Sequence, residues 1–290
     1  MIVLSVITVF YHSDDVKEDF LRSVDHLRSL LDEEVELLVR DNTSHNIGLS
    51  KAVNELIKKS HGDLILYVNP DMKLSSSVVN LINTTRSTGS PSVPTLVHHN
   101  VNRRYPTFTR IIFHHTWLGQ VIRRLGLRWI DDDYTYSHDK PRYIEQPAAF
   151  VLMSRDHIEQ ITEGGNVLFY DERFPVFWND VDLSMRARRA GLRFVHVASC
   201  RVYHVGRHST RTVSHERIMM LAYSSYGMIG FANKWNMHPH ILKLFFFLDA
   251  ILGVMAALRR FFLGRRSRYR LDDLAELVYR NTMAFRCSLR

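Results

Sequence analysis

The first seventy residues alternate two kinds of apolar pattern, and this alternation restricts the fold more than any other feature of the chain. Residues 2–10, 35–39 and 64–68 are almost continuously apolar, whereas residues 14–31 and 49–59 place apolar side chains at helical intervals. Continuous apolar strands are typical of a parallel sheet that is covered on both faces. The pattern therefore predicts an α/β domain with an open, mostly parallel sheet flanked by helices. Such a sheet binds its ligands at the carboxyl ends of its strands.

The later part of the chain continues this pattern more loosely. Strands are expected at residues 148–153 and 194–197, with a helix over residues 181–190 between them. From about residue 215 the spacing of apolar residues is almost wholly helical. We therefore expect a sheet domain over residues 1–214 and a helical, basic, membrane-associating region over residues 215–290.

The chain is basic, and the excess of positive charge is concentrated near its end. Lysine and arginine exceed aspartate and glutamate by eight, which implies an anionic partner. Nine arginines from residue 259 onward stand against three acidic residues, so the rest of the chain is nearly balanced. No helix-turn-helix, zinc or RNA-binding motif accompanies this patch, so nucleic acid is not expected as a partner.

An anionic membrane surface suits the same region better. Residues 244–258 are apolar, but they contain Asp249 and fall short of the roughly 20 residues that cross a bilayer. A helix that lies on the membrane, with arginines meeting lipid headgroups, fits this composition. The alternative is a core helix with a solvated, charged end.

Two features indicate the compartment. Two cysteines cannot form a disulfide framework and suit a reducing environment. The apolar run at residues 2–10 leads directly into polar and acidic residues, without the basic start and cleavage site of an export signal. We therefore expect a cytoplasmic protein, peripheral on the inner face of the cell membrane.

Three short motifs carry side chains that can do chemistry. The first is Asn69-Pro70-Asp71, directly after an apolar strand. A carboxylate in such a turn can reach a divalent cation that a diphosphate already holds, because magnesium accepts one or two protein oxygens together with phosphate oxygens. The alternative is an ordinary turn in which Asn69 and Asp71 bond to their own backbone.

The second motif is Asn179-Asp180-Val181-Asp182, at the start of the expected helix. Asp180 can be a helix N-cap, which accepts backbone N–H bonds. A carboxylate in this place can equally take a proton from an alcohol.

The third motif is His204, after the last strand-like run. A lone histidine usually has a structural role, but His204 can also complete a cation site with Asp71.

The order and context of these motifs resemble the family 2 glycosyltransferases with the GT-A fold. The resemblance runs from about Val3 to Gly206 and rests on seven segments: residues 5–12, 39–42, 46–54, 62–71, 146–153, 170–174 and 179–191. Within that family the chain is most similar to bacterial rhamnosyltransferases of O-antigen and cell-surface polysaccharide assembly, which share the Asn-Pro-Asp form and the Asp-Val-Asp-Leu helix.

The resemblance implies a role for individual residues. Asp71 would hold a divalent cation, Mg²⁺ or Mn²⁺, and His204 would be a second ligand or a diphosphate contact. Asp180 falls on the catalytic aspartate. The residues that fall where the family binds the nucleotide sugar are Thr8, Tyr11, Asp41, Asn46, Gly48 and Asn69. One departure is Asn179, where the family usually has Glu, so the base remains but the carboxylate that usually precedes it is absent.

The resemblance also implies an activity. We expect inverting transfer of L-rhamnose from dTDP-L-rhamnose to a saccharide carried on a polyprenyl diphosphate. Transfer of another hexose or of galactofuranose is an alternative, and a non-catalytic, membrane-associated nucleotide-binding protein is a further one. A single base with a cation explains why no nucleophile set is present.

Two other enzyme classes share the alternating pattern. A dinucleotide-dependent oxidoreductase has a glycine fingerprint after its first strand, and a nucleotidyltransferase has a glycine-rich, basic loop there. Residues 10–13 of this chain, Phe-Tyr-His-Ser, contain no glycine. This absence counts against both classes.

Overall fold

The computed structural model describes residues 2–97, 101–126, 134–135, 142–147, 149–164, 169–204, 224 and 226–262. By its internal contacts the chain divides into two compact units. The first unit comprises Met1–Tyr105 and Asp133–Arg211, and the second comprises Pro106–Asp132 and Thr212–Arg290. The second unit thus takes in a segment from the middle of the chain, which the sequence did not separate from the sheet domain. The division at residue 214 stays a prediction.

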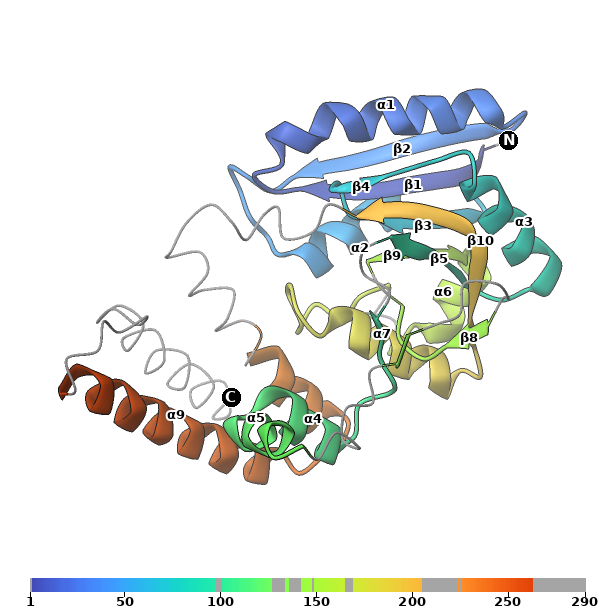
Figure 1. Ribbon diagram of the computed structural model, residues 1–290. Helices are drawn as coiled ribbons and strands as arrows, with labels where there is room; N and C mark the ends of the chain where they lie inside the picture. Colours follow the sequence, from blue (N-terminus) through green and yellow to red (C-terminus); the bar gives the residue numbers. More distant parts are fainter. Residues whose placement is uncertain are drawn as a thin grey trace. The chain divides into compact units, whose positions relative to one another are not determined.

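The first unit is built on a mixed sheet, drawn in Figure 1. The order of its strands is β2-β1-β3-β9-β5-β10-β4, and β8 pairs with β10 beside this path. Strands β1, β2, β3, β5 and β10 run in one direction, while β9, β4 and β8 run against them. The expected α/β class, a mostly parallel sheet flanked by helices, is confirmed. The bounds of these strands are Ile2–Phe10 (β1), Glu34–Asp41 (β2), Leu64–Val68 (β3), Met72–Lys73 (β4), Ser92–Val97 (β5), Arg142–Ile144 (β8), Phe150–Ser154 (β9) and Phe194–His204 (β10).

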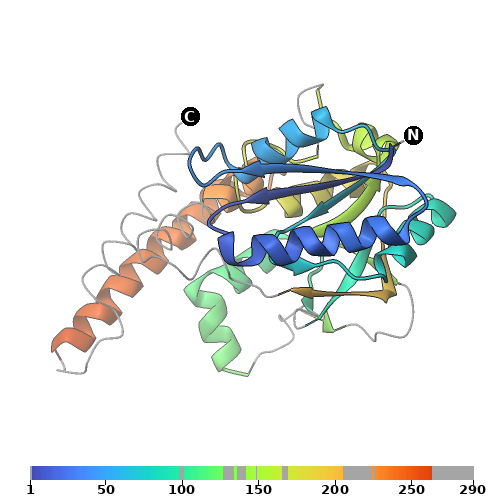
Figure 2. The same cartoon turned by 90° about the horizontal axis from the view of Figure 1, so that it is seen from above.

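Helices cover both faces of the sheet because its strands are apolar on both sides. Figure 1 shows α1 on one side of the strands and α2, α6 and α7 on the other, and Figure 2 shows α1 running along β1 and β2. One buried cluster joins the sheet to α1 and α3, and a second joins it to α2, α6 and α7. These helices span Asp14–Leu30 (α1), Leu49–Lys59 (α2), Val78–Thr88 (α3), Arg155–Ile161 (α6) and Asn179–Arg189 (α7).

Strand β10 is longer than the sequence predicts and changes partners along its length. Its first residues pair with β8, and its last two, Tyr203 and His204, pair with Lys73 and Met72 of β4. The pairing with β5 shifts register between Val197 and Arg201. The antiparallel pairing with β4 carries His204 to the turn that follows β3.

Residues 88–94 have the composition of a loop, but the structure begins β5 within them. Pro94 lies inside this strand, opposite Val197 of β10. All of Ser92–Leu96 is buried, so packing against both neighbouring strands outweighs the local preference. The strand expected at 148–153 is described from Phe150, because residue 148 lies outside the described residues.

The described part of the second unit is helical. It contains α4 (Phe108–His115), α5 (Trp117–Arg124), a helical stretch over residues 226–234, and the 24-residue helix α9 (Pro239–Phe262). Among the residues that the structure describes, no helix is both long and apolar enough to cross a membrane. Two short strands, β6 (Val101–Asn102) and β7 (Tyr134–Thr135), pair with each other and belong to the first unit.

Candidate active site

Asp71 and His204 meet at the carboxyl end of β3, as the sequence predicts for a cation site. The Nε2 atom of His204 lies 3.2 Å from Oδ2 of Asp71, and the two side chains are 19% and 12% exposed. The other carboxylate oxygen of Asp71, Oδ1, is buried and has no hydrogen-bond partner among the described residues. A buried, partnerless carboxylate oxygen costs free energy unless a ligand satisfies it.

These two residues fit a divalent cation that is shared with a diphosphate. Within the described ranges, no group of three or more histidine, cysteine, aspartate or glutamate side chains is placed to hold a metal. A pair of protein ligands is nevertheless what magnesium uses when substrate phosphates supply the remaining oxygens. Asp71 offers a hard oxygen and His204 a nitrogen, a combination that also suits manganese.

A buried tyrosine makes a hydrogen bond to the turn between β3 and β4. The hydroxyl of Tyr67, the fourth residue of β3, donates to Oδ1 of Asn69 over 2.7 Å. Asn69 is partly exposed, and its backbone carbonyl accepts from Met72 N. The amide oxygen of Asn69 therefore serves Tyr67 rather than its own backbone, unlike the ordinary turn considered above.

Residues expected to bind the nucleotide gather where β1 and β2 end side by side. Phe10 pairs with Asp41 in the parallel register, and Tyr11 follows Phe10. Asp41 is exposed, and hydrogen bonds from the hydroxyl and backbone N–H of Thr43 hold its pKa below the usual value. His12 has a left-handed backbone conformation, with φ of 46°, and its N–H donates to the Thr43 hydroxyl over 3.1 Å. Tyr11 and Asp41 are thus neighbours on the accessible end of the sheet.

Thr8 lies deeper than a ligand contact requires. It is fully buried in β1, and its hydroxyl oxygen has no hydrogen-bond partner within the described part of the chain. Alternation along the strand puts it on the side of Val6 and Phe10, which belong to the cluster packed by α1. As it stands, Thr8 presents no surface to a nucleotide.

Asn46 and Gly48 form the turn that begins α2. Gly48 N donates to Oδ1 of Asn46 over 2.8 Å, and Gly48 has φ of 85°, which favours glycine. A Cβ atom on Gly48 would lie 3.1 Å from Cβ of Pro175. The first N–H groups of α2, on Leu49 and Ser50, both donate to the Pro175 carbonyl, over 2.7 and 3.2 Å. Pro175, far along the chain, therefore accepts the hydrogen bonds of N–H groups that have no partner within the helix.

Helix α2 also fixes the segment that leads to Asp180. The side-chain amide of Asn54 donates to the Tyr170 carbonyl over 2.7 Å and accepts from Tyr170 N over 3.0 Å, across a sequence separation of 116 residues. The hydroxyl of Ser50 donates to the Phe174 carbonyl. The sequence placed Ser50 and Asn54 in a matching segment without giving either a role. Each makes its contacts with residues more than a hundred positions away, so no local pattern reveals them.

Asp180 is the second residue of α7 and not its N-cap. The cap position belongs to Trp178, which is left-handed with φ of 70° and makes no side-chain capping bond. Oδ1 of Asp180 accepts from Val181 N over 2.8 Å, and Asp180 is partly exposed. Burial raises its pKa above the ordinary value, while the Val181 N–H and Arg103 oppose that shift. The carboxylate thus holds protons more tightly than an ordinary aspartate, which is useful in a base.

Asn179 replaces the glutamate that the resemblance implies, and the structure gives it a different task. It is 4% exposed; its Nδ2 donates to Ser50 Oγ over 3.1 Å, and its Oδ1 accepts from Asp180 N over 2.8 Å. Ser50 gives its single hydroxyl hydrogen to the Phe174 carbonyl, so it can only accept from residue 179. A carboxylate cannot donate there, whereas an amide can. Asn179 therefore joins α7 to α2 without adding a second charge beside Asp180.

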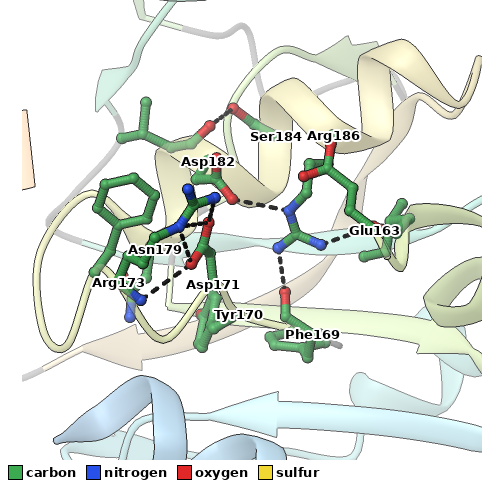
Figure 3. Close-up of polar contacts among 12 residues, drawn as sticks. Glu163, Phe169, Tyr170, Asp171, Arg173, Asn179, Asp182, Ser184 and Arg186 are labelled. Atoms are coloured by element: carbon green, nitrogen blue, oxygen red, sulfur yellow. Dashed lines mark hydrogen bonds and ion pairs between the residues drawn. The ribbon is translucent and has the colours of Figure 1, made fainter. Parts of the chain in front are cut away.

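The third member of the motif, Asp182, is fully buried and paired with Arg186, which is 1% exposed (Figure 3). Nε of Arg186 lies 2.8 Å from Oδ2 of Asp182, and its other nitrogens donate to the carbonyls of Ile161 and Phe169 over 2.9 and 2.6 Å. Every acceptor here thus faces a guanidinium donor. Arg186 thus joins α7 to the segment before Tyr170, and Asp182 has the structural task of pairing with this buried guanidinium, in contrast to the partly exposed Asp180.

Buried phenols connect the two carboxylates of the site. Tyr67 and Tyr170 are 1% and 2% exposed, and their rings meet edge to face with centroids 5.5 Å apart. Burial raises the pKa of Tyr67 far above its usual range, and Asp180 and Asp71 each raise it further. The phenol of Tyr67 therefore interacts electrostatically with both carboxylates. The site brings together a candidate base and a candidate cation pair on one edge of the sheet.

No protein-family model matches the sequence, and no curated protein is significantly similar to it. Among solved structures, GalNAc-T7 with UDP, GalNAc and Mn²⁺ is similar with a TM-score of 0.43 and 13% identity, covering 70% of this chain and 44% of its own. TarS residues 1–349 of S. aureus, in complex with UDP-GlcNAc, has a TM-score of 0.44 and 13% identity, with 79% of this chain and 67% of its own covered. A Drosophila beta-1,4-galactosyltransferase 7 mutant with manganese, UDP-Gal and xylobiose has a TM-score of 0.43 and 11% identity, with 75% and 79% covered. This chain thus spans less than half the length of the first of these proteins.

Proposed function

We propose that this protein is an inverting glycosyltransferase that uses a nucleotide-diphosphate sugar and a divalent cation. The observation that carries the proposal is the Asp71–His204 pair, with its partnerless buried Oδ1 atom, at the carboxyl edge of the sheet that also bears Asp180. An oxidoreductase or a plain binding module gives no reason for a buried carboxylate oxygen in that position.

The residues divide the reaction between them. Asp180 takes the proton from the acceptor hydroxyl while the oxygen of that hydroxyl bonds to the anomeric carbon of the donor sugar. The bond from the anomeric carbon to the diphosphate oxygen breaks at the same time. The proton ends on the Asp180 carboxylate, and the electron pair leaves with the nucleotide diphosphate. Asp71 and His204 would hold the cation, which supplies charge stabilisation to the departing diphosphate. Asn46, Gly48 and the ends of β1 and β2 orient the nucleotide.

For the substrates, we propose L-rhamnose from dTDP-L-rhamnose and a saccharide acceptor carried on a polyprenyl diphosphate. Support for this choice comes from the Asn-Pro-Asp form and the Asp180-Val181-Asp182-Leu183 helix, which resemble bacterial rhamnosyltransferases. A different hexose or galactofuranose is the competing donor, since donors that differ by one hydroxyl use pockets of the same kind.

The test is a screen of nucleotide sugars for hydrolysis and for thermal stabilisation, with and without Mg²⁺ or Mn²⁺. We expect one nucleotide sugar to stabilise the protein only when the cation is present. Asp71→Asn should abolish this cation-dependent stabilisation. Asp180→Asn is expected to keep donor binding and lose transfer by at least a hundredfold, the lower end of what general-base catalysis contributes. Full transfer by Asp180→Asn, or no binding of any nucleotide sugar by the wild type, contradicts the proposal.

We further propose that the protein lies on the inner face of the cell membrane through α9. Its large apolar side chains Ile241, Leu244, Leu248, Ile251 and Met255 are 42% to 60% exposed and recur every three or four residues, which places them on one side of the helix. Arg259 is exposed at the next turn, and the arginine-rich sequence from residue 259 adds positive charge. An apolar helix side followed by basic residues suits a membrane of anionic lipid. Residues 263–290 lie outside the described residues.

Vesicle sedimentation tests this second proposal. The full chain should sediment with vesicles that contain about a third phosphatidylglycerol, and less with pure phosphatidylcholine. Leu244→Ser with Ile251→Ser should release it, whereas His240→Ser, an exposed polar control in the same helix, should not. If the double variant sediments as before, the apolar side of α9 does not bind lipid. The same conclusion follows if the wild type is a dimer and the double variant is a monomer.

A further inference from the structure

We infer that Tyr67 is a positioning residue, which fixes the side chain of Asn69 so that its NH₂ group faces the oxygens of the bound sugar nucleotide. The inference rests on the proposed function and adds to it a residue that no motif of the sequence selects. Tyr67 itself is buried and touches no substrate.

The direction of the bond between Tyr67 and Asn69 follows from its two atoms. An amide oxygen can only accept, so the single hydroxyl hydrogen of Tyr67 goes to Oδ1 of Asn69, 2.7 Å away. Burial and the neighbouring Asp180 and Asp71 carboxylates raise the pKa of Tyr67, so that this phenol keeps its hydrogen at any physiological pH.

A permanent donor selects one of the two orientations of an amide. If the Asn69 side chain turned over, its NH₂ group would replace the oxygen that accepts from Tyr67, and the buried phenol hydrogen would lose this acceptor. The oxygen must therefore point to Tyr67 and the nitrogen away from it. Asn69 is partly exposed, and none of the described residues accepts a hydrogen bond from its Nδ2 atom.

The phenol that sets this orientation is itself held rigidly. Its ring packs against Phe169 and Tyr170, with centroids 5.7 and 5.5 Å away. Asn54 fixes the backbone of Tyr170 through two hydrogen bonds, of 2.7 and 3.0 Å. The chain of contacts from α2 through Tyr170 and Tyr67 thus ends at Asn69, two residues before Asp71. The free N–H groups of Asn69 suit an oxygen acceptor, which is a diphosphate oxygen or a hydroxyl of the donor sugar.

The experiment compares Tyr67→Phe, which keeps the ring and removes the hydroxyl, with Asn69→Ala and with the double variant. We expect Tyr67→Phe to raise the KM for the nucleotide sugar about fivefold, because one hydrogen bond contributes about 1 kcal/mol, and to leave kcat within about threefold. Asn69→Ala should raise KM at least as much, and the double variant should match Asn69→Ala alone, since Tyr67 acts through Asn69.

A matched control separates positioning from plain stability. Thr85→Val also removes a buried hydroxyl that hydrogen-bonds, to Ser92 at the amino end of β5 and so at the opposite edge of the sheet. It should lower the free energy of unfolding comparably and leave KM unchanged. Titration with the nucleoside diphosphate and Mg²⁺ gives a second readout: equal weakening of nucleoside diphosphate and nucleotide sugar by Tyr67→Phe identifies a diphosphate contact, and weakening of the nucleotide sugar alone identifies a sugar contact.

The outcomes also separate this inference from the proposed function. If the wild type binds no nucleotide sugar, the proposed function fails. If the wild type binds and transfers, but Tyr67→Phe keeps the wild-type KM and affinity, only the role of Tyr67 fails. Additive effects of Tyr67→Phe and Asn69→Ala overturn it as well, because they show that the tyrosine does not act through the amide.

Discussion

The buried ion pair in α7 permits a prediction whose size follows from its contacts. Arg186→Met keeps an unbranched, apolar side chain in the place of the arginine stem but removes the charge and all donors. Asp182, which is fully buried, then loses the guanidinium 2.8 Å away. The carbonyls of Ile161 and Phe169 lose their Arg186 donors at the same time.

The expected loss is large compared with the stability of a typical protein. Removing one partner of a buried ion pair costs about 3–5 kcal/mol, and each carbonyl left without a donor adds about 1 kcal/mol or more. These costs overlap, so we expect the free energy of unfolding to fall by about 4–6 kcal/mol. Against a total of about 5–15 kcal/mol, such a loss leaves the sheet unit marginal.

Urea denaturation followed by circular dichroism measures this change. Arg189→Met is the matched control, because Arg189 lies on the same helix in an ion pair with Glu163 but is 63% exposed. An exposed pair contributes about 0–1 kcal/mol, so the control should stay close to the wild type. Asp182→Leu combined with Arg186→Met removes the buried charge and should recover part of the loss. A loss below about 1 kcal/mol for Arg186→Met would refute the reasoning.

Three further predictions concern the site and its surroundings. Because burial raises the pKa of Asp180, the acid limb of the transfer rate should lie at a higher pH than for an ordinary aspartate, as a pH-rate profile can show. Asp180→Asn should raise the free energy of unfolding at neutral pH, because the folded wild type then bears the cost of an ionised, buried carboxylate. Urea denaturation measures this second change. Gly48→Ala should lower the free energy of unfolding by about 1–2 kcal/mol, since alanine disfavours a φ of 85° and its Cβ would crowd Pro175, and a midpoint equal to that of the wild type would contradict this. Burial raises the pKa of Cys200 to about 12, so iodoacetamide at pH 8 should label this residue only after unfolding, as peptide mass spectrometry can show.

Much of the site could be predicted because its residues sit at the ends of strands. The apolar run that ends at Val68 indicates where the chain reaches the carboxyl edge of the sheet, and Asp71 follows within three residues. The strand that carries His204 was also recognisable, although it runs seven residues beyond its predicted end. Parallel strands bring such ends to one edge, but the contact between the two residues depends on the antiparallel pairing of His204 with Met72 of β4, which the sequence did not predict.

The supporting residues could not be predicted in the same way. Tyr67 is one apolar position in a buried strand, and nothing in its neighbours distinguishes a phenol that orients Asn69 from one that only fills space. Asn54 looks like a polar residue on a surface helix, yet it is 1% exposed. The short strands β4 and β8 were missed because two or three residues give no periodicity. Long-range contacts, and not local preference, define all of these features.

The carbonyl of Pro175 at the start of α2 has a consequence for the order in which the chain can fold. The hydrogen bonds at this end of the helix, including the Ser50 bond that spans 124 residues, form only after the chain past Pro175 has been synthesised. During translation the first strands and α1 can assemble while the start of α2 still frays, because contacts of long sequence separation come late. A ribosome-bound chain that ends before Pro175 would thus lack the contacts that hold the turn of Asn46 and Gly48 at the start of α2. The completion of this turn therefore depends on a segment more than a hundred residues further along the chain.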